Sequence, residues 1–300
     1  MRGPVPSAHG RVWTTEGRGA NLSPSLPRRA VLPPPPDAHE RREVHCERVG
    51  RNYPSDPFVM GASFAWLRAS RAPNSASPLP HSLISALPPS RNLHDYHLRL
   101  DGHAWSIQHR GAILSEADET RYLGEQQGLI PYGVMLWPSS IALAHELVAR
   151  ADSLAGLRIL ELGAGTGLPG IVAATFGARV LQTDRLDVAL DLCRRNAERN
   201  HVSIEHRVAD WTDWSDEDRY DLILGADVMY AERLHSFLRH IFDTNLAPGG
   251  RMLMADPFRP RSLPLLEALE TDGWTVALTK WTVGDSDQNL PIGVYEVVRP

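Results

Sequence analysis

Cysteine and lysine are scarce in this chain of 300 residues. The two cysteines, Cys46 and Cys193, argue against a disulfide framework, and we expect Cys193 to be buried within a helix. Lys280 is the only lysine, so arginine supplies almost all of the basic charge. No apolar run approaches the roughly 20 residues of a membrane-spanning helix, and no apolar stretch typical of a signal peptide is evident. We therefore expect a cytoplasmic protein with no membrane partner.

Proline and charge are unevenly distributed along the chain. Residues 1–90 hold 15 of the 24 prolines and carry 11 arginines against six acids, a net charge of +5. Since the whole chain carries −5, residues 91–300 carry −10. Low periodicity and high proline content predict that residues 1–90 are a disordered Pro/Arg-rich segment and that residues 91–300 form one folded domain.

Two kinds of partner are disfavoured by the composition. The acidic charge of residues 91–300 opposes a phosphate backbone, so we expect no nucleic-acid partner. The thirteen histidines form no metal-ligand spacing, and pairs such as His235 and His240 have no third ligand near them in the sequence. No metal site is predicted.

A glycine-rich turn at Glu161–Gly167 is the most informative motif. It follows an apolar run typical of a buried strand and precedes Leu168–Ala174, which is typical of a helix start with proline in its first turn. Such a turn lets the backbone approach a nucleotide closely. We expect the cofactor to contact Gly163, Gly165 and Gly167. Because the spacing also satisfies the dinucleotide fingerprint, the turn alone allows NAD as well as S-adenosylmethionine (SAM).

Acidic residues end the next two predicted strands. Asp184 follows the strand 178–183 and is suited to accept hydrogen bonds from both ribose hydroxyls, which NAD and SAM share. Alternatively, it is a helix N-terminal acid. Asp210 follows the strand 204–209 and can accept a hydrogen bond from the adenine amine. The neighbouring Trp211 either covers the adenine ring or packs in the core.

Strands and helices alternate through the rest of the chain, which predicts a parallel α/β sheet. Further strands are expected at 220–225, 251–255, 274–281 and 292–298, the last two forming an antiparallel edge. Helices are expected at 139–150, 187–200, 232–246 and 262–272. Asp101 and Gly102 form the turn of a hairpin at 96–108.

The glycine turn, Asp184, Asp210-Trp211 and the turn at 248–250 together resemble those of the seven-strand SAM-dependent methyltransferases. Tyr132–Pro138, Asp227-x-x-Tyr230 and Asp256–Pro260 are similar to motifs of the lysine methyltransferase-like family, which includes bacterial nicotinamide N-methylase-like proteins. The resemblance implies a Rossmann-like seven-stranded class I methyltransferase sheet with an antiparallel edge strand and an N-terminal β-hairpin. It also implies SAM as the cofactor and a protein lysine amine as the acceptor.

Methyl transfer is an in-line displacement, so the enzyme must align the acceptor lone pair, the methyl group and the sulfur. The resemblance makes Asp227 the residue that orients the amine, and Tyr230 a further hydrogen-bond donor. Trp137 is expected to pack beside the cofactor, and Glu161 to position the glycine turn or the cofactor's amino group. The structural alternatives are a helix cap for Asp227, a surface aromatic for Tyr230, a core tryptophan for Trp137 and a solvated acid for Glu161.

Other functions stay open at this stage. A small-molecule N-methyltransferase needs the same site, with residues 91–135 closing the cleft. A nucleic-acid methyltransferase is disfavoured because the chain has Asp227–Tyr230 where adenine-methylating enzymes carry an Asn/Asp-Pro-Pro-aromatic motif. An NAD-dependent oxidoreductase leaves Asp210 and Asp227 unexplained. A SAM-binding module without catalytic activity is the non-enzyme alternative.

Overall fold

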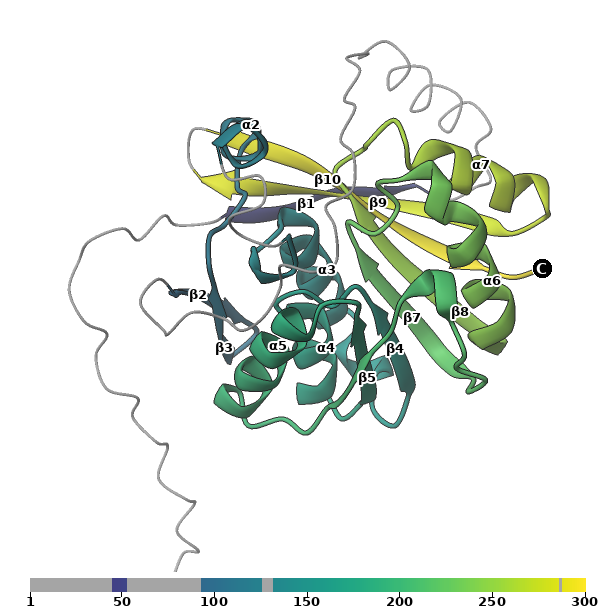
Figure 1. Cartoon of the computed structure of the whole chain (residues 1–300), viewed down its shortest axis with the longest axis horizontal. Helices are drawn as coiled ribbons and strands as arrows, with labels where there is room; N and C mark the ends of the chain where they lie inside the picture. Colours follow the sequence, from purple (N-terminus) through teal and green to yellow (C-terminus); the bar gives the residue numbers. More distant parts are fainter. Residues whose placement is uncertain (1–44, 53–92, 126–131, 286–287) are drawn as a thin grey trace, which may run out of the picture. The chain divides into compact units, whose positions relative to one another are not determined.

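The structure, a computed structural model, describes residues 45–52, 93–125, 132–285 and 288–300. A large sheet carries helices on both faces, and a separate hairpin lies beside it (Figure 1). The strands are β1 (His45–Asn52), β2 (His94–Leu100), β3 (His103–His109), β4 (Arg158–Leu162), β5 (Arg179–Asp184), β6 (Glu205–Val208), β7 (Tyr220–Ala226), β8 (Leu246–Asp256), β9 (Thr275–Asp285) and β10 (Gln288–Val298). The helices are α2 (Glu116–Glu125), α3 (Pro138–Val148), α4 (Leu168–Thr175), α5 (Asp187–Arg199), α6 (His235–Asn245) and α7 (Leu263–Thr271). The short 3₁₀ turns are η2 (Tyr132–Val134), η3 (Ala151–Ser153), η4 (Trp211–Asp213) and η5 (Glu232–Leu234).

The strand order of the large sheet is β1-β9-β10-β8-β7-β4-β5-β6. Strands β8, β7, β4, β5 and β6 are mutually parallel, whereas β10 is antiparallel to both β8 and β9. The seven strands from β9 to β6 confirm the predicted class I methyltransferase sheet. Strands β9 and β10 pair antiparallel near one end of the sheet, as the sequence predicts for the last two strands, and β10 lies between β9 and β8. The order reverses at β4, and ligands of open α/β sheets bind beside such a switch point, at the carboxyl ends of the strands.

Strand β1 is an eighth strand and corrects one expectation. It pairs antiparallel with β9 along His45–Asn52, within the segment 1–90 that the sequence predicts to be disordered. For these eight residues the prediction of disorder is wrong, because the open edge of β9 supplies backbone hydrogen-bond partners that a local pattern does not reveal. The other residues of 1–90 lie outside the described part, and their disorder stays a prediction.

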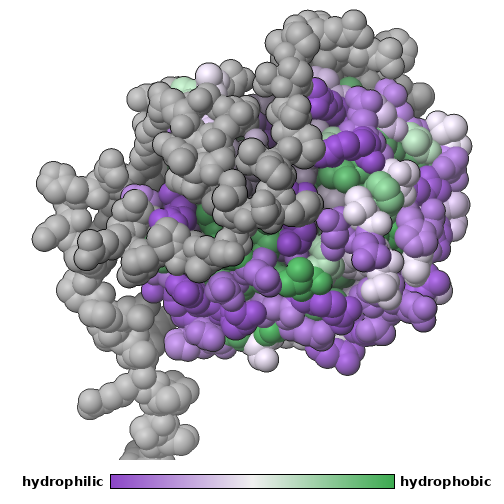
Figure 2. All heavy atoms as spheres, viewed as in Figure 1, coloured by the Kyte–Doolittle hydropathy of each residue, from purple (hydrophilic) through white to green (hydrophobic). Residues whose placement is uncertain are grey.

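Two apolar layers cover the sheet. Alternate residues of each strand point to opposite faces, so Leu222 and Leu224 pack in one layer with α3 and α4, while Ile223 packs in the other with α6 and α7. The central strands β4 and β7 are buried on both faces, which explains their largely apolar sequences. On the face seen in Figure 2, the described surface is mainly hydrophilic, with apolar side chains in small separate patches.

The predicted hairpin is confirmed as β2 and β3, which pair from His94 with His109 to Leu100 with His103. Asp101 and Gly102 both have positive φ, 47° and 79°, as a two-residue turn of this kind requires. The hairpin contacts α5, so it lies beside the helix that follows Asp184. Among the described residues, no helix is both long and apolar enough to cross a membrane.

Candidate functional site

The glycine turn between β4 and α4 has the backbone conformation that the sequence indicates. Gly163, Gly165 and Gly167 have φ values of 60°, 56° and 81°, all in the left-handed region that glycine enters without steric cost. Gly167 is the residue before α4, and Pro169 lies in the first turn of that helix. A Cβ atom added at Gly163 would lie 3.2 Å from Val228 and 3.4 Å from the ring of Trp211. The turn therefore holds its shape in tight surroundings.

Glu161 is turned into the protein beneath this turn. Its side chain is buried, and Oε2 accepts hydrogen bonds from the Gly170 amide at 3.1 Å and from the Gln182 side-chain amide at 2.7 Å. The same Gln182 amide donates to the Gly167 carbonyl at 2.9 Å. Burial raises the pKa of Glu161 to about 8, although both hydrogen bonds favour the ionised form. Glu161 thus holds the end of the turn to α4, and it is not the solvated acid that the sequence left open.

Helix α5 fixes the turn from its other side. Cys193, buried as predicted, donates its thiol hydrogen to the Gly165 carbonyl at 3.0 Å, and burial raises its pKa. Asn196 donates to the Thr166 carbonyl at 2.9 Å and to the Gln108 carbonyl at 3.0 Å. One buried amide therefore links the glycine turn to the hairpin.

Asp184 ends β5 directly beside the turn. Its two oxygens accept hydrogen bonds from the Gly165 amide at 3.1 Å and from the Leu186 amide at 2.9 Å. The residue is 8% exposed, and this burial raises its pKa. A carboxylate can accept about four hydrogen bonds, so acceptor capacity remains for a ligand.

Asp210 and Trp211 follow β6, the strand next to β5. Asp210 caps η4 by accepting from the Thr212 amide at 2.9 Å. The Trp211 ring packs partly against the apolar layer of α6 and α7 and also faces Gly163. The ring therefore packs partly in the core, and covering of an adenine ring by Trp211 stays a prediction.

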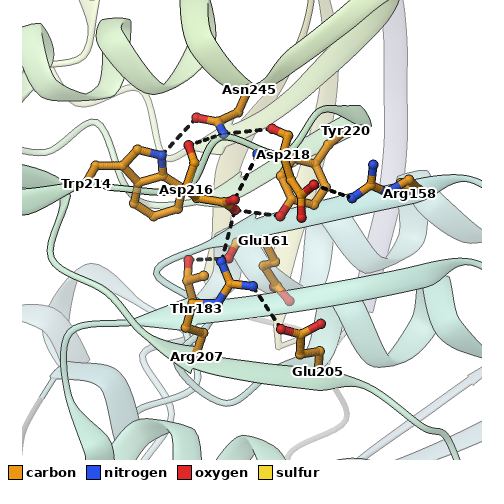
Figure 3. A network of polar contacts seen from close by, with 10 residues as sticks. All are labelled: Arg158, Glu161, Thr183, Glu205, Arg207, Trp214, Asp216, Asp218, Tyr220 and Asn245. Carbon is orange, nitrogen blue, oxygen red and sulfur yellow. Dashed lines mark hydrogen bonds and ion pairs between the residues drawn. The ribbon is translucent and has the colours of Figure 1, made fainter.

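A polar network anchors the loop that follows Trp211 (Figure 3). Asn245, fully buried at the end of α6, accepts from the Trp214 indole at 2.9 Å. Its amide donates to the carbonyls of Asp216 and Asp218, both at 2.8 Å. The Tyr220 hydroxyl donates to the Asp216 carboxylate at 2.6 Å. The loop with Asp210 and Trp211 is thereby tied to the core.

Trp137 lies in a cluster of aromatic residues before α3. Its ring stacks on Tyr132 with centroids 5.7 Å apart, and Tyr122 of α2 meets both rings edge-on. The Trp137 indole donates to the Tyr132 carbonyl at 3.1 Å. The adjacent Gly133 carries its carbonyl 3.4 Å from where a Cβ of Gly165 would lie. The η2 turn of this cluster therefore lies beside the glycine turn. Contact of Trp137 with a cofactor stays a prediction.

Asp227 is the first residue after β7, and hydrogen bonds hold both its backbone and its carboxylate. It has a positive φ of 56°, and its amide donates to the Ala255 carbonyl at 2.8 Å. Its carboxylate forms a bidentate pair with Arg259, with both nitrogen–oxygen distances at 2.8 Å. Arg259 also binds Glu119 of α2 at 2.7 Å. Tyr230 is 44% exposed, and its pKa is raised by burial of the hydroxyl and, to a smaller extent, by the charges of Asp184 and Asp227.

The sequence reasoning missed Arg259 and Glu119. Arg259 belongs to the motif Asp256–Pro260, from which only a family resemblance was inferred. A basic residue directly after a predicted strand could have indicated a partner for an acid at the end of a neighbouring strand. Glu119 lies on α2, a helix that hydrophobic periodicity does not predict. Only the structure shows that Arg259 joins Glu119 to Asp227. Arg259 and Glu119 extend the candidate site from the glycine turn to Asp227, at the carboxyl end of β7.

Residues 118–262 match the protein family described as lysine methyltransferase. The chain is 38% identical over 130 residues to mouse (Mus musculus) protein N-lysine methyltransferase METTL21A, covering 40% of this chain and 59% of that protein. It is 39% identical over 106 residues to the histone-arginine methyltransferase METTL23 of Xenopus laevis, covering 33% and 45%. It is also 33% identical over 134 residues to the zebrafish (Danio rerio) electron transfer flavoprotein beta subunit lysine methyltransferase, covering 43% and 51%.

The chain thus spans about half the length of the curated relatives that it matches. The matched residues 118–262 include the glycine turn, Asp184, Asp210, Asp227 and Arg259. This part of the chain, just under half of its length, is therefore similar to the lysine methyltransferase family.

Proposed function

We propose that this protein is a SAM-dependent N-methyltransferase whose acceptor is a lysine amine of a protein. The observation that carries the proposal is the order of groups along one edge of the sheet. The glycine turn, Asp184, Asp210 and Asp227 follow β4, β5, β6 and β7, respectively. This order supports the proposal, because these four neighbouring parallel strands end at the same edge of the sheet, where ligands of such sheets bind.

The residues present fit SAM. The left-handed glycines leave the backbone of the turn without side chains, and a Cβ at Gly163 would crowd Val228. The remaining acceptor capacity of the Asp184 carboxylate suits the ribose hydroxyls, and Asp210 suits the adenine amine. Glu161 supports the turn from below. When bound, SAM supplies a methyl group on a positively charged sulfur, which the acceptor's lone pair displaces.

In this proposal, Asp227 orients the acceptor amine and stabilises its charge. A lysine ammonium has no lone pair, so the amine reacts in its neutral form and gains positive charge during transfer. A fixed carboxylate stabilises that developing charge and directs the amine by a hydrogen bond. Asp227 is fixed by its backbone and by Arg259. We further propose that the exposed Tyr230 donates a hydrogen bond to the same acceptor.

An arginine guanidine is the second candidate acceptor, and one observation favours it. The relative named histone-arginine methyltransferase is as similar to this chain as the lysine enzymes are. A small amine is a third possibility for the same site. A cytoplasmic location also stays a prediction.

The test is a transfer assay with the full chain, methyl-labelled SAM and lysate from a strain that lacks the gene. Label in methyl-lysine after hydrolysis of the protein fraction supports the proposal, and label in methyl-arginine supports the second candidate. Label in small molecules alone overturns a protein acceptor. An Asp227→Asn variant that binds SAM normally, measured by calorimetry, is expected to lose transfer. SAM binding by the wild type without transfer to any fraction would favour an inactive binding module.

A further inference from the structure

Arg259 joins three separate elements of the structure. It follows β8 and uses Nε and Nη2 to bind both oxygens of Asp227, which follows β7. Its third nitrogen, Nη1, binds Glu119 on α2 at 2.7 Å. A guanidinium presents its donors in a rigid planar fork, so a bidentate pair fixes the orientation of the carboxylate as well as its charge.

The Asp227 carboxylate has little freedom besides this pair. Its side chain is only 7% exposed, and its backbone is held in the left-handed region by a hydrogen bond to Ala255. Arg259 uses one acceptor position on each oxygen, which leaves one on each for a ligand. The carboxylate is therefore paired and still able to accept a hydrogen bond from an acceptor amine.

We propose that Arg259 is a positioning residue that orients the Asp227 carboxylate for methyl transfer, and that Glu119 holds Arg259 in place from α2. This inference rests on the proposed function, because it takes Asp227 as the carboxylate that meets the acceptor. It extends the reaction site to α2 and assigns a task to two residues outside the cofactor-binding turn.

Several ionisable groups face this pair. Asp256 is buried at the end of β8 and accepts a hydrogen bond from the backbone amide of Arg259 at 2.6 Å. Burial and the charge of Asp227 raise the pKa of Asp256. Tyr132 of η2 and Tyr230 also feel the charges of this cluster. Removing the guanidinium would leave Asp227, Asp256 and Glu119 without the cation that they share. The pKa of Asp256 should then rise further, because the positive charge of Arg259 lowers it.

The experiment compares kcat, KM and SAM affinity of Arg259→Gln, Arg259→Lys and Asp227→Asn with those of the wild type. We expect Arg259→Gln to lower kcat about 100-fold, the size of effect that a small misplacement of a reacting group produces, with SAM affinity unchanged. Arg259→Lys should recover only part of the activity, because an ammonium keeps the charge without the fork. A matched control is Arg239→Gln. Arg239 is also paired with two acids, Asp243 and Asp272, and its side chain is 27% exposed, compared with 25% for Arg259.

Two readouts separate positioning from a structural role. The pH–rate profile of Arg259→Gln should move to higher pH, whereas that of Arg239→Gln should not move. The double variant Asp227→Asn/Arg259→Gln should be no slower than Asp227→Asn alone, since Arg259 acts through Asp227. A normal kcat with a lowered melting temperature, or additive losses in the double variant, would overturn the inference. Full activity of Asp227→Asn would overturn the proposed catalytic assignment itself, and the inference with it.

Discussion

Alanine at Gly163 tests whether the shape of the glycine turn is required for SAM. Gly163 and Gly156 both have positive φ, 60° and 79°. A Cβ at Gly156 would meet no atom within 4 Å, whereas one at Gly163 would lie 3.2 Å from Val228 and 3.4 Å from Trp211. Gly156→Ala is therefore a matched control that pays only the conformational cost.

The expected magnitudes follow from this difference. A non-glycine residue in the left-handed region costs about 1–2 kcal/mol, so Gly156→Ala should lower the melting temperature by roughly 2–8 °C at about 2–4 °C per kcal/mol. Gly163→Ala carries the same cost plus about 1–3 kcal/mol for crowding. Because Val228 must give way and the added methyl group occupies space beside Trp211, SAM affinity should also fall at least about tenfold, or about 1.4 kcal/mol.

The assay is thermal unfolding without ligand, followed by calorimetric titration with SAM. Gly156→Ala should bind SAM as the wild type does. If Gly163→Ala also bound SAM with wild-type affinity, the turn at Gly163 would not form part of the cofactor site, and the reasoning would be refuted.

Three further predictions concern the supports of the site. Asn245→Ala should lower the free energy of unfolding by about 2–4 kcal/mol in a denaturant titration, because it leaves an indole N–H and two carbonyls unpaired; a loss below about 0.5 kcal/mol would contradict the network. Since the folded-state pKa of Glu161 is raised to about 8 from 4.5, stability should fall as pH rises between these values, by at most about 1.4 kcal/mol per pH unit. Glu161→Gln should remove that component, and an unchanged slope would mean that Glu161 is ionised throughout. Gly133→Ala places a Cβ 2.7 Å from the Ala189 Cβ, so it should destabilise the wild type by about 1–3 kcal/mol and less in an Ala189→Gly background, and equal losses in both would exclude this clash.

The sequence by itself determined the βα alternation, the hairpin and the cofactor turn. These features are local: apolar runs of strand length, an Asp-Gly turn and glycines at fixed spacing each act within a few residues. The same locality predicted that Gly163, Gly165 and Gly167 form one turn and that Asp184 ends the following strand. Both are found, because parallel strands deliver their carboxyl ends to one edge.

Tertiary structure decided what distant residues do to one another. Strand β1 exists in the described structure because β9 offers a free edge, and no pattern in residues 45–52 specifies that partner. Glu161 is buried because Gln182 and Gly170 enclose it, although a strand-end acid looks solvated in the sequence. The ion pairs of Arg259 join residues 32 and 140 positions apart. Charge, burial and hydrogen-bond geometry at a site depend on such long-range neighbours, and only the folded chain brings them together.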